Sequence, residues 1–243
     1  MDKIAGIGKS YRRKLARVLE VHSAILTSEK VASVLEVPKQ EASRLLARWE
    51  HRGWIQRIHR GSYVPIALSS TNSKPAIENP AVVAESLYGP GYVGGFSAVK
   101  HWDLSEQIFE DFTYFTTKHV KNRAPLHGDI RYRLKTVVPN RVFGVEPVWF
   151  GTTKTHVSDP TKTLIDLFDD PSLAGGMSVV RDIFDEYLSS EYFDFDLLLS
   201  YAIRNNNRAV QKRIGFLLES SFDPIDTQLE GCLLYTSPSP RDS

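Results

Sequence analysis

The sequence predicts an α+β protein, and three observations lead to that fold class. Residues 10–65 hold short segments with apolar positions at helical spacing, followed by two short alternating segments. Further alternating segments lie between 109 and 150. From 159 onward, apolar residues recur every three or four positions over several helix lengths. A sheet followed by a run of helices is typical of α+β architecture.

Residues 1–66 begin with three predicted helices. The first spans 10–21, and Thr27 can cap the second because its hydroxyl can accept from the free backbone N–H groups of the first helical turn. Pro38 disfavours a helical residue before it, so a short turn separates the second helix from the third. The third helix ends at Gly53, a typical left-handed cap.

The third helix has an apolar face and a polar face. Its apolar face, which we expect to pack in the core, consists of Ala42, Leu45, Leu46 and Trp49. Its opposite face has no acid at the centre and offers donors of the kind that read base edges. The candidate DNA-reading residues on it are Lys39, Gln40, Ser43, Arg44 and Arg48.

Residues 54–65 predict a two-stranded hairpin after these helices. Arg57, His59 and Arg60 place positive charge at or near its tip. Helices, short turn and basic hairpin together predict a winged helix-turn-helix that binds double-stranded DNA, with the hairpin as the wing. The alternative is a small helical domain whose hairpin binds protein.

The charge distribution also favours a polyanionic partner for the N-terminal domain. The formal net charge of the 243 residues is +1, but residues 1–66 hold thirteen Lys or Arg and six Asp or Glu, a balance of +7. Residues 159–230 hold six basic and fourteen acidic residues, a balance of −8. We expect phosphate contacts at the start of the first helix, from Lys9, Arg12 and Arg13. The alternative is that the two halves attract each other.

The composition excludes several kinds of site and environment. The single cysteine, Cys232, excludes an intramolecular disulfide and a multi-cysteine zinc site. The histidines lack metal-ligand spacing, so we expect neither metal nor cofactor. No signal peptide opens the chain, and no apolar run reaches the roughly 20 residues of a membrane helix. A cytoplasmic protein without membrane association is expected.

Residues 67–79 are polar and predict a linker, and residues 80–230 predict the second domain. We expect this domain to contain a small, mostly antiparallel sheet and a C-terminal run of helices. Residues 231–243 closely resemble a translated sequencing-adapter tail, so we expect the natural C-terminus to be missing. The alternative is a disordered tail rich in serine and proline.

Other features of the second domain suggest alternative functions. Gly94-Gly95 followed by Ser97 is similar to the loop of nucleotidyltransferases, but the Asp-x-Asp at Asp194 lies far downstream at a helix start, so no enzymatic activity is expected. The basic loop 118–123 is either a second DNA contact or, as we favour, a solvated turn. A sheet rich in aromatic residues can instead bind a small ligand that tunes DNA affinity. The candidate residues for such a site are Tyr92, Phe96, Trp102, Tyr114 and Trp149.

Four motifs, in their order along the chain, resemble the AbiEi family of antitoxins. They are Arg60-Gly61-Ser62-Tyr63-Val64-Pro65, Tyr92-Val93-Gly94-Gly95-Phe96-Ser97-Ala98, His101-Trp102 with Thr116-Thr117-Lys118, and Ser158-Asp159-Pro160 with Thr163-Leu164-Ile165-Asp166. The resemblance covers the chain from about residue 8 to residue 220.

The resemblance implies a transcriptional autorepressor that is also an antitoxin, encoded next to a nucleotidyltransferase-like toxin of the AbiEii type. In this family the winged-helix domain binds inverted repeats in the promoter of its own operon, and the C-terminal domain is needed for antitoxicity. One winged helix covers a half-site, so we expect two copies on the promoter, as a homodimer or as cooperative monomers. Such families also include solitary members with no toxin beside them. The family supplies no catalytic residue.

Overall fold

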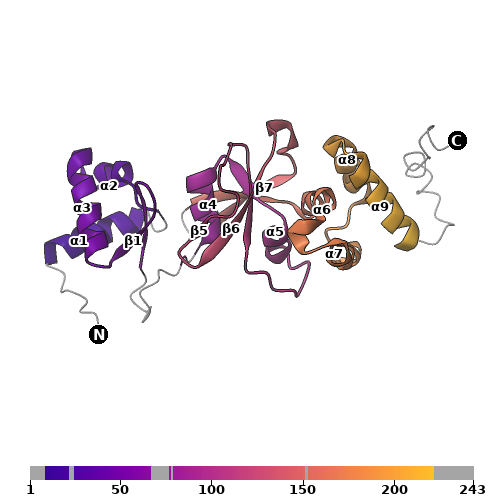
Figure 1. Ribbon diagram of the computed structural model, residues 1–243, viewed down its shortest axis with the longest axis horizontal. Helices are drawn as coiled ribbons and strands as arrows, with labels where there is room; N and C mark the ends of the chain where they lie inside the picture. Colours follow the sequence, from indigo (N-terminus) through magenta and orange to yellow (C-terminus); the bar gives the residue numbers. More distant parts are fainter. Residues whose placement is uncertain (1–8, 22–24, 67–76, 78, 151–152, 222–243) are drawn as a thin grey trace. The chain divides into compact units, whose positions relative to one another are not determined.

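The computed structural model describes residues 9–21, 25–66, 77, 79–150 and 153–221 (Figure 1). It shows an α+β protein with a small antiparallel sheet, a larger mixed sheet and helices. Most of the predicted linker, 67–79, and all of the predicted non-native tail, 231–243, lie outside the described residues. The chain divides into two compact units, which are Met1–Tyr92 with Glu110–Thr136 and Pro147–His156, and Val93–Phe109 with Val137–Glu146 and Val157–Ser243.

The N-terminal elements, here called the head, are three helices and a hairpin. They are α1 (Lys9–Val21), α2 (Ser28–Leu35), α3 (Lys39–His51), β1 (Ile55–His59) and β2 (Ser62–Pro65). Thr27 caps α2, because its hydroxyl accepts from the Lys30 N–H at 3.4 Å. Glu36 ends α2 in the left-handed region at φ 56°, and Pro38 precedes α3. The predicted cap and turn are confirmed.

The core of the head is formed by apolar side chains from all of its elements. The four residues predicted on the apolar face of α3 are buried, and Gly53 has a φ of +72° just after that helix, as predicted. β1 and β2 pair antiparallel, so the predicted hairpin is confirmed. Leu26 and Tyr63 exchange backbone hydrogen bonds of 2.8 and 3.0 Å, which tie the segment before α2 to the hairpin.

The larger sheet has six strands in the order β5-β6-β4-β3-β8-β7. The strands are β3 (Gly91–Val93), β4 (Phe112–Thr116), β5 (Leu126–His127), β6 (Ile130–Thr136), β7 (Val145–Phe150) and β8 (Thr153–Ser158). β4 and β6 run parallel from Phe112↔Tyr132 to Thr116↔Thr136. β3 and β8 also run parallel, whereas β5 and β6 are antiparallel.

The prediction of a mostly antiparallel sheet in the second domain was therefore wrong. Strands that follow each other in sequence often pair as antiparallel hairpins, but β4 and β6 are separated by β5, which pairs antiparallel with β6. This short strand reverses the chain once more, so β4 and β6 point the same way. β8 was not predicted, although its burial alternates: Thr155 and Val157 are buried, while Lys154 and His156 are exposed.

Helix α4 (Pro80–Tyr88) packs on β4 in the first unit. Asn79 caps it by accepting from the Val82 N–H at 3.3 Å. The Tyr114 hydroxyl on β4 donates to the Glu85 carboxylate on α4 at 2.7 Å. Burial and the neighbouring Glu85 raise the pKa of Tyr114 well above its ordinary value, so the phenol stays protonated.

The second unit is built around α6, which packs against α5, α7, α8 and α9 (Figure 1). The helices of this unit are α5 (Phe96–His101), α6 (Pro160–Asp169), α7 (Met177–Ser189), α8 (Phe195–Asn205) and α9 (Arg208–Ser221), with short 3-10 turns η1 (Pro139–Arg141) and η2 (Pro171–Ala174). The apolar spacing in the sequence predicts a core role for Ile183, Phe184, Leu197, Leu198 and Leu199. Ile183, Phe184 and Leu198 are fully buried, whereas Leu197 and Leu199 are half-buried. Within the described ranges, no helix is both long and apolar enough to cross a membrane.

Candidate nucleic-acid interface

The face of α3 opposite the core is exposed at every predicted reading position. Helical periodicity explains this arrangement, because four apolar side chains bury one face and turn the other to solvent. The exposed side chains include Lys39, Gln40, Ser43, Arg44 and Arg48. Ala47 lies among them and is also exposed, so no bulky side chain fills the centre of this face.

Arg44 is the reading candidate whose charge is least compensated. Among the residues that the structure describes, it has no hydrogen bond or ion pair. Its guanidinium carries five N–H donors in a planar fork. All of these donors are available to a ligand on the exposed face of α3.

Lys39 is partly neutralised, which the sequence did not predict. It forms an exposed ion pair with Glu29 on α2. The hydrogen bond from Lys39 lowers the pKa of Glu29 to about 2, so Glu29 is charged at neutral pH. A second ion pair links α1 and α3, with Lys14 Nζ 3.6 Å from Glu41 Oε1. Both lysines therefore offer less net charge to a polyanion than the arginines do.

Arg48 is held by a residue of α1. Its Nη1 donates a hydrogen bond to the Tyr11 hydroxyl, and its Cζ lies 4.7 Å from the centroid of the Tyr11 ring. Arg52 lies over the same ring at 5.6 Å and over the Trp54 ring at 5.5 Å. Tyr11 and Arg52 were missed as site residues. The spacing of Tyr11 from Leu15 and Val18 is that of a core stripe, so nothing local revealed its contact with α3.

The hairpin tip presents the three predicted basic residues to solvent. Arg57, His59 and Arg60 are all exposed. Arg57 Nε donates to the His59 carbonyl at 3.3 Å, and the strand pairing shifts register between these two residues. Gly61 provides the positive φ of +78° that the tight connection requires. The tip is thus a compact basic projection.

The start of α1 supplies the third predicted group of contacts. Arg12 and Arg13 are exposed, and no acid lies in the described first turn of α1. Lys9 begins α1, but its side chain lies outside what the structure describes. The head therefore carries exposed positive charge on α1, on α3 and at the hairpin tip.

The loop 118–123 has exposed basic side chains and is anchored by its backbone. Thr116 Oγ1 accepts from the Lys118 N–H at 3.0 Å, and the Arg123 carbonyl accepts from the Leu134 N–H at 2.8 Å. Lys118, His119, Lys121 and Arg123 are exposed. These features fit the solvated turn that we favour from the sequence, and the second DNA contact stays an untested alternative.

The residues considered for nucleotidyl transfer have structural roles. Gly95 precedes α5 with a φ of 56°, and its carbonyl accepts from Ala98 and Val99. Asp194 caps α8 by accepting from the Leu197 N–H at 2.9 Å. In the described part of the chain, no group of three or more His, Cys, Asp or Glu side chains could hold a metal ion. No observation links the glycine pair to Asp194.

The aromatic residues considered for a ligand site mostly contact other parts of the protein. Tyr92 stacks on Phe115 with ring centroids 4.9 Å apart. Phe96 packs against Phe109 at 4.0 Å, and the Trp102 Nε1–H donates to the Ser158 carbonyl at 2.6 Å. Tyr114 bonds to Glu85, as described above, whereas Trp149 is 66% exposed. These contacts are internal packing and hydrogen-bonding contacts. Among the described residues, they do not bring the five aromatic side chains together at one site.

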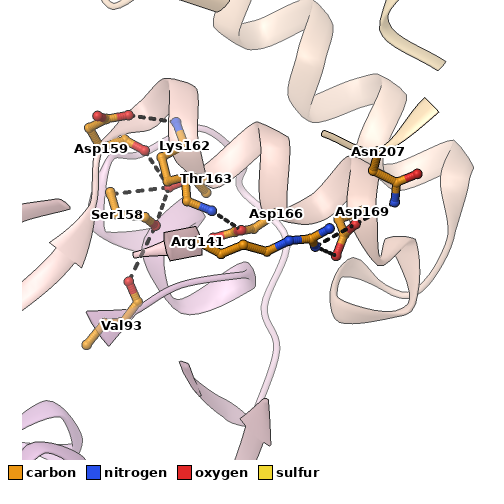
Figure 2. Close-up of polar contacts among 9 residues, drawn as sticks. All are labelled: Val93, Arg141, Ser158, Asp159, Lys162, Thr163, Asp166, Asp169 and Asn207. Carbon is orange, nitrogen blue, oxygen red and sulfur yellow. Dashed lines mark hydrogen bonds and ion pairs between the residues drawn. The ribbon is translucent and has the colours of Figure 1, made fainter. Parts of the chain in front are cut away.

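The motif around Ser158 and Asp159 forms a buried polar network at the start of α6 (Figure 2). The Asp159 carboxylate accepts from the Lys162 N–H at 2.6 Å and from the Tyr201 hydroxyl at 2.9 Å. Burial raises the pKa of Asp159, although these two hydrogen bonds oppose the rise. Thr163 Oγ1 lies 2.7 Å from Ser158 Oγ. The network thus caps α6 and joins it to β8 and α8.

A second part of the network is a buried ion pair on α6 (Figure 2). Lys162 Nζ binds the Asp166 carboxylate one turn later, and both side chains are almost fully buried. Lys162 Nζ also lies 4.7 Å from the centroid of the Phe143 ring. Farther along α6, Asp169 accepts from Arg141 Nη1 at 3.2 Å and from Asn207 Nδ2 at 2.8 Å. The motif residues Ser158, Asp159, Thr163 and Asp166 are buried in this network and hold elements of the second unit together.

Comparison with known proteins shows similarity in fold alone. No family model matches the chain, and no curated protein is similar to it in sequence. The structure is similar to the crystal structure of the RV2827C protein from Mycobacterium tuberculosis, with a TM-score of 0.61. The two sequences are 13% identical over an alignment that covers 93% of this chain and 81% of the other.

Proposed function

We propose that this chain is a DNA-binding transcriptional autorepressor whose head is a winged helix-turn-helix. The observation that carries the proposal is the exposed polar face of α3, opposite a buried apolar face. Helices α2 and α3 are joined by a turn that holds Pro38, and a basic hairpin follows α3, as a winged helix requires. In this proposal α3 enters the major groove and the hairpin tip meets the phosphate backbone or a minor groove.

Affinity and specificity come from different side chains in this mechanism. The exposed arginines of α1 and the hairpin tip contact phosphates, which supplies most of the affinity and makes it salt-dependent. Arg44 can place two N–H donors on the O6 and N7 acceptors of guanine. One bidentate contact of this kind contributes roughly 1–3 kcal/mol of discrimination against a wrong base. Gln40 and Ser43 add shorter polar groups on the same face.

The proposal extends to antitoxin function, which depends on the resemblance to the AbiEi family. Ser158, Asp159, Thr163 and Asp166, which carry part of that resemblance, are buried. These residues therefore contribute to the fold of the second domain. A toxin that binds this chain would have to contact exposed residues outside this motif.

The experiment that tests the repressor proposal is fluorescence anisotropy with the full chain. One probe is DNA from immediately upstream of its own start codon, and the other is a scrambled duplex of the same length, each at two salt concentrations. We expect tight binding to the upstream DNA that survives scrambled competitor. Equal, salt-sensitive binding to both probes would show that the head does not read sequence, and no binding would contradict the DNA-binding proposal.

The antitoxin proposal is tested by co-expression with an adjacent gene for a nucleotidyltransferase-like protein. We expect growth inhibition by that protein alone and recovery when this chain is present. The Arg44→Ala variant should still restore growth, because the change lies on the DNA-reading face. Failure of the wild-type chain to restore growth beside a toxic neighbour would contradict the antitoxin part and leave the repressor part intact.

A further inference from the structure

The contact between Tyr11 of α1 and Arg48 of α3 joins two elements proposed to touch DNA. We propose that Tyr11 is a positioning residue for sequence recognition, because it holds the Arg48 guanidinium in one orientation on the exposed face of α3. The inference rests on the proposed function. It adds Tyr11, a residue of α1, to the proposed recognition residues of α3.

The packing of Tyr11 allows it to hold the Arg48 side chain in place. Its ring is half-buried and packs against the core of the head, so its position is fixed by the fold. The hydroxyl accepts from Arg48 Nη1, and Arg48 Cζ lies over the ring, 4.7 Å from its centroid. A hydrogen bond and a cation–π contact together restrict the several rotatable bonds of Arg48.

The contact leaves Arg48 able to bind. A guanidinium has five N–H donors, and the hydrogen bond to Tyr11 uses one of them. The side chain of Arg48 is exposed, so the remaining donors are accessible to a base edge or a phosphate.

The surroundings of Tyr11 favour an anionic partner. Arg52 shares the Tyr11 ring with Arg48, so two guanidinium groups converge on one aromatic side chain. Arg12 and Arg13 follow Tyr11 directly in α1 and are exposed. Like charges in close proximity repel each other, and a bound phosphate would relieve that repulsion. The surface around Tyr11 is thus both ordered and electropositive.

Pre-ordering predicts a specific pattern of affinity. An arginine that is already oriented loses less conformational freedom when it binds, and this gain appears only where Arg48 makes an oriented contact. Replacing the hydroxyl should therefore weaken binding to the cognate sequence more than binding to random DNA. A tyrosine that merely packs in the core would affect both DNAs equally.

The test is a double-mutant cycle of Tyr11→Phe and Arg48→Ala in the full chain, measured by anisotropy on the upstream and scrambled duplexes. We expect Tyr11→Phe to weaken binding to upstream DNA roughly two- to tenfold, with less than about twofold change on scrambled DNA. In the Arg48→Ala background, the Tyr11→Phe change should have no further effect. Tyr63→Phe is the matched control, because Tyr63 packs against the same core and its hydroxyl has no bond within the described residues. It should bind like the wild type.

Three results would overturn the inference. Tighter binding by Tyr11→Phe would show that Tyr11 withholds Arg48 from DNA. Unchanged binding would show that the contact is irrelevant to recognition. A loss that persists in the Arg48→Ala background would show that Tyr11 acts through packing or its own DNA contact. These outcomes are distinct from failure of the proposed function, in which the wild-type chain itself would not prefer the upstream DNA.

Discussion

At the residue scale, the basic side chains of the head differ in whether another side chain of the protein already binds them. Lys39 and Lys14 have carboxylate partners, and Arg48 is hydrogen-bonded to Tyr11. Arg44 has no such partner among the described residues. A free, exposed guanidinium on a reading face can adapt to a base edge, whereas a paired lysine must first lose its partner. Arg44 is therefore the strongest candidate for discrimination.

Replacing Arg44 should separate specificity from general affinity. We expect Arg44→Ala to cost roughly 1–3 kcal/mol on upstream DNA, because the bidentate base contact is lost. Its loss on scrambled DNA should be modest, since phosphate contacts remain. Arg12→Ala is the matched control, and it should weaken binding to both duplexes about equally. An equal loss on both DNAs for Arg44→Ala, measured by the same titrations, would show that Arg44 touches phosphate only.

The buried ion pair in α6 predicts a large effect on stability. Lys162→Met leaves the Asp166 carboxylate buried without its ammonium partner, and breaking a buried pair in this way costs about 3–5 kcal/mol. The double variant Lys162→Met, Asp166→Leu removes both charges and should recover most of that loss. Urea denaturation of the full chain measures these free energies of unfolding.

An exposed pair offers the control for this prediction. Arg181 and Asp185 on α7 have the same i,i+4 spacing but lie 3.9 Å apart at the surface. Arg181→Met should change the free energy of unfolding by less than about 1 kcal/mol, because solvent screens such pairs. A double α6 variant as unstable as Lys162→Met alone would show that the pair itself, and not the stranded charge, stabilises the fold.

At the element scale, the turn between α2 and α3 contains a residue in an unfavourable conformation. Glu36 has φ 56° and ψ 43°, in the left-handed region, and ends α2 with a hydrogen bond from its N–H to the Ala32 carbonyl. Side chains with a Cβ are strained there, by roughly 1–2 kcal/mol. The geometry of this turn sets the direction of α3 relative to α2, so the strain is tied to the orientation of the α3 face that we propose to read DNA.

Glu36→Gly should therefore stabilise the protein. Glycine removes the Cβ strain but adds conformational entropy to the unfolded chain, so we expect a net gain of about 0.5–1 kcal/mol. Asn206 ends α8 in the same region at φ 51°, and asparagine tolerates this conformation better than glutamate. Asn206→Gly should give a smaller gain. Thermal unfolding compares the two, and a destabilised Glu36→Gly variant would contradict the account of the turn.

At the scale of the whole molecule, local sequence signals predicted where helices begin better than they predicted which strands pair. Thr27 marks the start of α2 through a hydrogen bond to the residue three positions away, so the sequence alone located this helix. β8 was missed and the parallel pairings were misjudged, because strand partners are chosen by packing between distant segments. The exposed face of α3 followed from its periodicity. Periodicity did not predict the contact between Arg48 on this face and Tyr11, because 37 positions separate the two residues in the sequence.

The net charge of the whole molecule is a poor guide to the strength of the proposed DNA binding, and the salt dependence of binding can test this. A net charge of +1 would give weak attraction if the protein acted as one diffuse charge. Interactions are screened beyond roughly 8–10 Å at moderate salt, so a duplex on the head responds mainly to the basic side chains nearby. Binding should then release counterions in proportion to the phosphates contacted.

The slope of log affinity against log salt should reveal this local charge. With about four phosphate contacts, from residues such as Arg12, Arg13 and Arg60, we expect a slope near −4 on upstream DNA between roughly 50 and 200 mM salt. Arg12→Ala should reduce that slope by about one, whereas Arg44→Ala should leave it nearly unchanged because a base contact releases few counterions. A wild-type slope shallower than about −1 would mean that the exposed arginines do not lie on the phosphate backbone.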